Sequence, residues 1–175
     1  GNEEWNLTTA MADEAIKHMK ELKEVAPEKP FFVYYVPGGT HAPHHPTPEW
    51  IEKISEMHLF DQGWNKLRET IFENQKRLGI MPENAKLTEW PKELPEWDSK
   101  SDLEKKLFIK QMDVYAAYLA YTDNEIGRVI QSVEDMGQLD NTLIIYINGD
   151  NGASSEGMLD GTPNEFTFFN GVAVP

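Results

Sequence analysis

The chain has 175 residues, of which 30 are acidic and 16 are basic, so its formal net charge is −14. This charge argues against a nucleic-acid partner, because phosphate backbones are held by Lys and Arg. The sequence contains no cysteine, which excludes disulfides, thiolate metal sites and a cysteine nucleophile within it. Its apolar runs are too short to span a bilayer, so no membrane contact is expected.

The first part of the chain predicts a helix followed by a buried strand. Apolar residues recur at helical spacing over 11–22, and two prolines soon afterwards end that helix. The continuous aromatic and β-branched run 31–36 is typical of a strand buried on both faces, as in a parallel sheet. Residues 37–46 form an irregular loop at the carboxyl end of this strand, where open α/β sheets bind ligands.

Further along, helices are predicted over 48–54, 61–78 and 101–136, and the proline-containing stretch 80–97 is expected to be a surface excursion. A second strand is predicted over 141–148, and a hairpin over 166–174. The order helix, strand, helices, strand indicates an α/β domain. Two strands are too few for a complete sheet, so residues 1–175 are expected to be part of a larger domain.

Asp150 and Asn151 follow the second predicted strand, between two glycines. A carboxylate and an amide oxygen are hard donors of the kind that Ca²⁺ and Mg²⁺ prefer. The flanking glycines let the backbone bend and let a ligand approach closely. The same four residues are also typical of a simple tight turn, and both interpretations stay open from the residues alone.

Three histidines, His41, His44 and His45, lie in the loop after the first predicted strand. Prolines in this loop oppose the helical geometry that would place them on one face, so a closed zinc site is not favoured. A single histidine acting as a proton donor near neutral pH is a better interpretation. An exposed loop with incidental histidines is the alternative.

Taken together, the stretches 29–45, 115–133 and 141–152 resemble the sulfatase family, within the alkaline-phosphatase-like superfamily. The segments 60–64 and 95–97 are similar to those of one bacterial arylsulfatase subgroup. The resemblance implies a three-layer α/β/α fold, present here as a partial domain. It also implies a periplasmic or secreted enzyme that cleaves sulfate esters of small molecules or glycans.

The resemblance also implies roles for individual residues. Asp150 and Asn151 would be two ligands of a Ca²⁺ or Mg²⁺ ion, and His41 would contact the sulfate ester and protonate the leaving oxygen. It assigns no role to His44. The nucleophile of the family is a formylglycine, which attacks sulfur and is made from a Cys or Ser in a Cys/Ser-x-Pro/Ala-x-Arg motif.

That motif is missing from this chain, as are the early metal-binding Asp pair of the family and its later substrate-binding Lys. The sequence is therefore interpreted as the central portion of a sulfatase catalytic domain, with the nucleophile supplied from outside it and the chain alone inactive. Two alternatives are a phosphoric or phosphonate ester hydrolase of the same superfamily and a non-catalytic domain that has kept the fold.

Overall fold

The computed structural model describes residues 5–149, 159, 161, 162 and 164–171. Within these residues the regular structure is helical. The elements are α1 Leu7–Val25, α2 Pro48–Ser55, α3 Gly63–Arg77, the 3₁₀ turn η1 Trp97–Ser99, α4 Asp102–Asp135, the 3₁₀ turn η2 Leu139–Asn141 and α5 Glu165–Phe169. No described helix is both long enough and apolar enough to cross a membrane.

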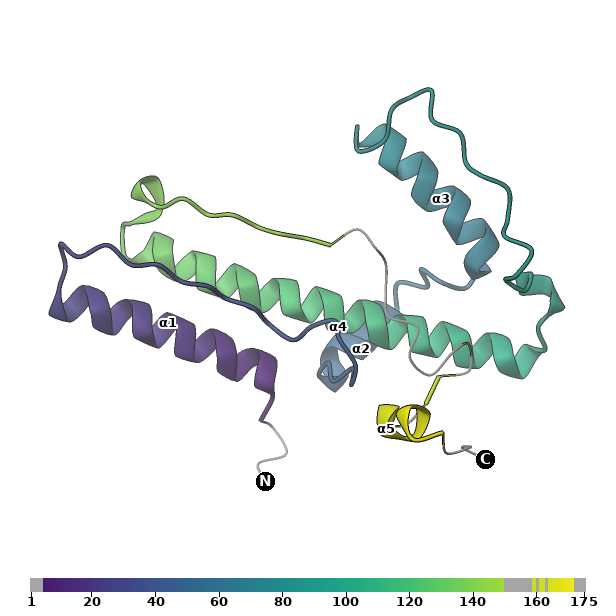
Figure 1. Ribbon diagram of the computed structural model, residues 1–175, viewed down its shortest axis with the longest axis horizontal. Coiled ribbons are helices and arrows are strands. Elements are labelled where there is room, and N and C mark those ends of the chain that lie inside the picture. The colour runs from purple at the N-terminus through teal and green to yellow at the C-terminus, as the bar shows by residue number, and fades with distance from the viewer. Residues whose placement is uncertain (1–4, 150–158, 160, 163, 172–175) are drawn as a thin grey trace.

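Helix α4 is the longest element, and the other parts of the fold are arranged around it (Figure 1). Ser101 begins it with a capping box, in which its hydroxyl accepts from the Glu104 backbone N–H and the Glu104 carboxylate accepts from the Ser101 N–H. Gly137, at a φ of 68°, follows its last turn. The predicted helix over 101–136 is thereby confirmed.

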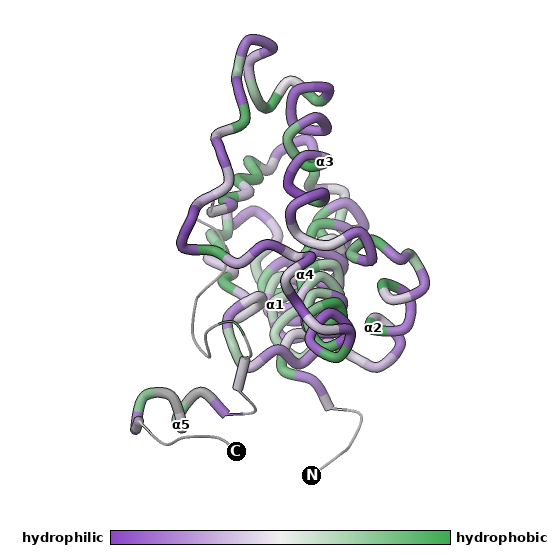
Figure 2. Tube along the Cα trace, turned by 90° about the vertical axis from the view of Figure 1, so that its right-hand side faces the viewer, coloured by the Kyte–Doolittle hydropathy of each residue, from purple (hydrophilic) through white to green (hydrophobic). Residues whose placement is uncertain are grey.

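Helices α1 and α2 both pack against α4. A buried apolar cluster joins α1 to the C-terminal part of α4 and consists of Ala12, Met19, Val129 and Val133. At α2, the Ser55 hydroxyl donates to the buried Asp113 carboxylate across 2.9 Å. Figure 2, which looks almost along α1 and α4, shows α3 standing away from this pair.

The predicted three-layer α/β/α architecture is wrong for the described residues, which contain no strand. Residues 31–36 and 142–149 have no regular structure. Within the described part of the chain, the backbone hydrogen bond that either segment makes is the local turn from the Thr142 N–H to the Leu139 carbonyl oxygen. Each lies along the helices instead: Phe31 and Tyr35 pack against the α1–α4 cluster, whereas Phe32 is 91% exposed. β-Propensity indicates residues whose side chains suit a half-buried pleated surface. A sheet also needs a neighbouring strand with which the segment can pair.

The predicted hairpin over 166–174 is also wrong in its described part, because Glu165–Phe169 form the short helix α5. Residues 172–175 lie outside the described residues. The helices predicted over 48–54 and 61–78 are present as α2 and α3.

The excursion over 80–97 is held to α3 and α4 by aromatic side chains. The rings of Trp64 and Trp97 meet edge to face with centroids 4.9 Å apart, and Phe108 of α4 lies 5.4 Å from Trp64. The Trp64 indole N–H donates to the Pro95 carbonyl oxygen across 3.0 Å. Gly63 permits this packing, because a Cβ there would lie 2.3 Å from the Trp97 ring.

A polar contact complements the apolar cluster between α1 and α4. Arg128 of α4 donates to Asp13 of α1 and to Glu125, whose side chain is buried. The hydrogen bond to Asp13, followed by those to Glu125, raises the pKa of Arg128 despite its partial burial. The guanidinium therefore neutralises a carboxylate that would otherwise be buried without a counter-charge.

Replacing Arg128 by Met should lower the free energy of unfolding by about 1–3 kcal/mol, because it leaves the buried Glu125 carboxylate with the Asn124 amide as a donor but without a counter-charge. Urea unfolding followed by circular dichroism measures this. The control is Lys17→Met, which removes an exposed ion pair with Glu14 and should cost under about 1 kcal/mol. The double variant R128M/E125L should be more stable than R128M, and equal midpoints for R128M and K17M would contradict the interpretation.

Candidate functional site

His41 is exposed in the loop over 37–46, and two short hydrogen bonds fix it there. Its backbone N–H donates to the Gly38 carbonyl oxygen across 2.8 Å, which closes a turn. Its ring Nδ1 lies 2.7 Å from the Ala42 carbonyl oxygen. Because a carbonyl can only accept, Nδ1 carries the proton in this contact, and Nε2 is the ring atom left to bind and release a second proton.

The loop around His41 is packed on α4. The Thr40 hydroxyl donates to the Tyr115 hydroxyl across 3.0 Å. On the other side of Thr40, Gly39 lies so close to α4 that a Cβ there would be 2.1 Å from the Thr122 Oγ1 atom. Thr122 is buried, so its side chain has little space in which to move aside. A glycine at position 39 is what allows the loop to approach the helix this closely.

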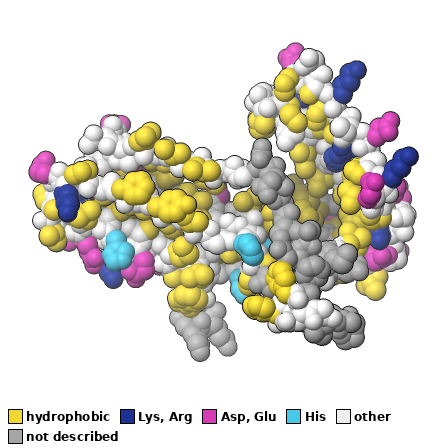
Figure 3. All heavy atoms as spheres, viewed as in Figure 1, with side chains coloured by type: hydrophobic (Ala, Val, Ile, Leu, Met, Phe, Trp, Pro, Cys, Tyr) yellow, Lys and Arg dark blue, Asp and Glu magenta, His cyan; other side chains and the backbone are white. Residues whose placement is uncertain are grey.

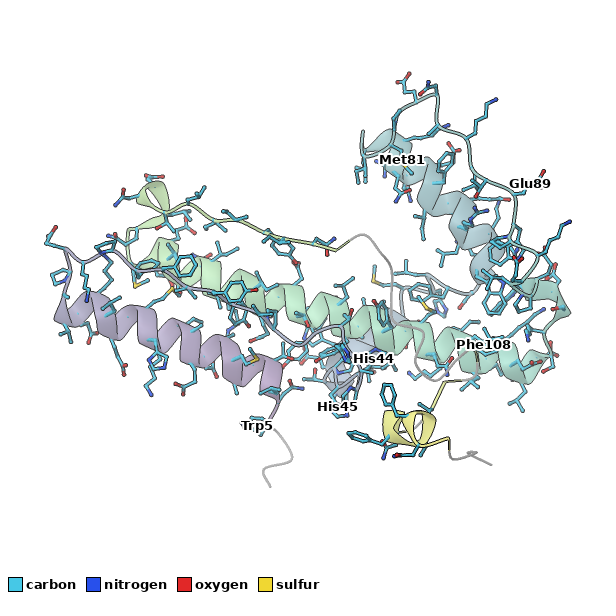
Figure 4. All side chains as sticks on the ribbon, viewed as in Figure 1. Trp5, His44, His45, Met81, Glu89 and Phe108 are labelled. Atoms are coloured by element: carbon cyan, nitrogen blue, oxygen red, sulfur yellow. The ribbon has the colours of Figure 1, made fainter. Side chains whose placement is uncertain are left out.

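His44 packs by one edge against the same helix. Its ring centroid lies 5.2 Å from that of Tyr115 at nearly a right angle, and 6.2 Å from that of Tyr118. His44 is exposed at the surface, but its contact with α4 removes part of the ring from water, and this partial burial lowers the pKa of His44. A hydrogen bond with the Thr40 backbone opposes the shift, and the neighbouring His41 and His45 lower the pKa further. Figure 4 shows His44 and His45 together near the middle of α4. In the same view, the space-filling picture in Figure 3 shows histidine side chains near the centre of the molecular surface.

The lowered pKa of His44 predicts that acid weakens the protein. The unfolded chain takes up this proton near the ordinary histidine value of 6.5, whereas the folded chain does so only at lower pH. Protonation therefore favours unfolding, so the stability present above pH 6.5 is lost as pH falls through the folded pKa.

His44→Phe keeps an aromatic ring beside Tyr115 and Tyr118 but removes the titration. The fall in the free energy of unfolding between about pH 7.5 and about pH 5 should be smaller in H44F than in the wild type, measured by urea unfolding. The two proteins differ only at position 44, so the difference between their pH dependences reports His44. Identical pH dependence in the two would show that this environment does not disfavour the charged ring.

Asp150 and Asn151 lie outside the described residues, so the structure does not test their prediction as metal ligands. Among the described residues, no three His, Asp or Glu side chains gather closely enough to hold a metal ion. The segment that leads to Asp150 is described as far as residue 149. In it, the Tyr146 hydroxyl donates to the Asp123 carboxylate of α4 across 3.4 Å, and burial, followed by Asp123, raises the pKa of Tyr146.

Helix α4 thus contacts both the histidine loop and the segment that leads to Asp150. Tyr115, Tyr118 and Thr122 recur at helical spacing and form the face beneath the histidine loop, while Asp123 meets the segment before Asp150. The sequence predicted the aromatic positions of this helix as core and missed their contacts with the loop. A hydroxyl on a half-buried Tyr is a signal for such a contact, but it does not identify the partner.

Comparisons with known proteins identify the family. The family model of the sulfatases matches residues 2–175. The chain belongs to the sulfatase family. This confirms the family resemblance seen in the motifs around His41 and Asp150.

Curated relatives carry the same name. An uncharacterized sulfatase of Schizosaccharomyces pombe is 33% identical over 148 residues, which are 79% of this chain and 25% of that protein. An arylsulfatase of Klebsiella aerogenes is 28% identical over 133 residues, which are 76% of this chain and 28% of that protein. The chain therefore spans about a quarter of the length of the curated relatives it matches.

Proposed function

We propose that the longer protein containing this chain is an arylsulfatase-type enzyme that hydrolyses sulfate esters of small molecules or glycans. The observation that carries this proposal is the match of the sulfatase family model over 2–175, which includes His41 and Asp150. The similarity to an arylsulfatase supports the same class. A periplasmic or secreted location belongs to the proposal through the family resemblance.

His41 is the proposed general acid of the reaction. Its Nδ1 proton is engaged by the Ala42 carbonyl, so the imidazolium form presents its other proton on the exposed Nε2 side of the ring. As the bond between sulfur and the leaving oxygen breaks, that oxygen gains negative charge and the Nε2 proton passes to it. Neutral His41 then regains a proton from water before the next turnover.

Asp150 and Asn151 are proposed to hold a Ca²⁺ or Mg²⁺ ion, which their carboxylate and amide oxygens fit as hard donors. When bound, such a cation withdraws electron density from sulfate oxygens and stabilises negative charge in the transition state. Two ligands do not fill the six to eight positions of calcium, so the remaining ligands come from elsewhere in the protein. The nucleophile, proposed as a formylglycine, likewise lies outside this sequence.

His41→Ala in the full-length protein should lower kcat for an alkyl sulfate by roughly 10²–10⁴-fold, the usual contribution of a general acid to a leaving group that needs a proton. Turnover of p-nitrophenyl sulfate by the wild-type protein, compared with that of p-nitrophenyl phosphate, assigns the reaction class. His18→Asn, at an exposed position on α1, is the matched control and should retain wild-type activity. Cleavage of the phosphate ester without the sulfate ester would favour the phosphatase alternative, and no turnover of either would favour a non-catalytic domain.

Asp150→Ala should weaken Ca²⁺ binding to the full-length protein, because it removes a charged ligand oxygen. Isothermal titration of chelator-treated protein with CaCl₂, and then with MgCl₂, measures the affinity and identifies the preferred ion. Asp140→Ala, at an exposed carboxylate in η2, is the control and should bind as the wild type does. Equal affinities for D150A and D140A would show that Asp150 is not a ligand.

A further inference from the structure

One tyrosine of α4 contacts the histidine loop on both sides of His41. The Tyr115 hydroxyl accepts a hydrogen bond from Thr40, the residue immediately before His41. The Tyr115 ring also meets the ring of His44, three residues after His41, with centroids 5.2 Å apart and planes at 88°. Both contacts come from a side chain in the middle of a long helix, which is the more rigid of the two elements.

Between these two contacts the loop has little freedom of its own. The His41 N–H is bonded back to Gly38, and its ring Nδ1 is bonded forward to Ala42. These local bonds make the peptide and the ring of His41 move with residues 38–42 as a unit. The position of that unit relative to the rest of the protein is then set by its contacts with α4.

A further contact fixes the same unit about two turns along the same face of α4. Gly39 touches Thr122, which is buried and whose hydroxyl has no hydrogen-bond partner among the described residues. Thr122 therefore limits the position of the loop by close packing, whereas Tyr115 does so through a directional hydrogen bond. The two residues lie seven positions apart, so they share one side of α4.

We infer that Tyr115 is a positioning residue for His41, which it holds in place through its hydrogen bond with Thr40. This inference rests on the proposed role of His41 as the general acid. Tyr115 touches neither the ring of His41 nor, in this role, the substrate. Its hydroxyl fixes the loop from which the imidazole reaches the leaving oxygen.

The chemistry of the leaving group gives the inference a specific signature. A nitrophenolate leaves without much help, whereas an alkoxide needs a proton as the bond to sulfur breaks. A misplaced acid therefore slows alkyl sulfates far more than nitrophenyl sulfate, and errors of about 1 Å in position can cost up to about 100-fold. General loss of structure would slow both substrates alike.

The test compares Tyr115→Phe and Thr40→Val in the full-length protein, with kcat/KM measured on p-nitrophenyl sulfate and on an alkyl sulfate. Both variants should lose about 10-fold or more on the alkyl sulfate and less than about 2-fold on the nitrophenyl ester. Thr40→Ser keeps the donor and should restore near wild-type values. The double variant Y115F/T40V should be no slower than either single variant, because both remove the same bond.

Tyr34→Phe is the matched control, since Tyr34 is 80% exposed and should tolerate loss of its hydroxyl. Wild-type rates on the alkyl sulfate in both Y115F and T40V, alongside a slow H41A, would overturn the inference and leave the proposed function standing. An equal loss on both substrates would also overturn it, because that pattern indicates general disruption.

Nitrogen NMR of the His41 ring tests the inference without any substrate. In the wild type and in Y34F the neutral ring should hold its proton on Nδ1, whereas in Y115F and T40V the two tautomers should average as the contact with Ala42 loosens. Unchanged ring shifts in Y115F would overturn the inference even if the protein has no sulfatase activity.

Discussion

The packing of α4 against α1 is the contact on which the rest of the described structure depends. It combines a small apolar cluster with a guanidinium that faces carboxylates on both helices, and only one of those carboxylates is buried. The ion pair and the apolar cluster together limit how far α4 can slide along α1 or rotate about its own axis. The positions of the other side chains of α4 are set by this packing.

This packing explains how α4, which has no proposed catalytic residue, can determine the position of residues at the proposed site. Loops tolerate motion, and a proton donor on a loop is only as well placed as the surface beneath it. Here the surface consists of two tyrosines and a threonine on one face of α4, and the loop comes close enough to need a glycine. The same helix reaches the segment before Asp150 through Asp123. The loop of His41 and the segment that leads to Asp150 therefore rest on one helix.

The sequence predicted the helices well, because 3.6-residue periodicity and capping residues are properties of the helix itself. The long helix was recognisable from Ser101 and Glu104 at its start and from Gly137 after its end. The two strands predicted over 31–36 and 141–148 were wrong for the described residues. A sheet is a relation between segments, and residues 31–36 and 142–149 have no strand beside them in the described chain.

The site was predictable only in part, because sequence patterns reveal local features more readily than contacts between distant segments. His41 stood out because its loop follows an apolar run, and its family resemblance gave it a role. The importance of Tyr115 was hidden, because an aromatic residue at helical spacing is usually core and its hydroxyl contact with Thr40 spans 75 positions in the sequence. The predicted ligands Asp150 and Asn151 fall outside the described residues, so their part of the site stays a prediction.

The two extended segments have a practical consequence for handling the protein. Four side chains on these segments expose 80% or more of their surface: Phe32, Tyr34, Leu143 and Ile147. The backbone beside them pairs with no other strand among the residues that the structure describes. Unpaired extended edges with apolar side chains are the surfaces through which separate molecules join into aggregates. A preparation of this chain by itself is therefore expected to aggregate as its concentration rises. The concentration at which it can be studied is then limited by association between molecules through residues 31–36 and 142–149.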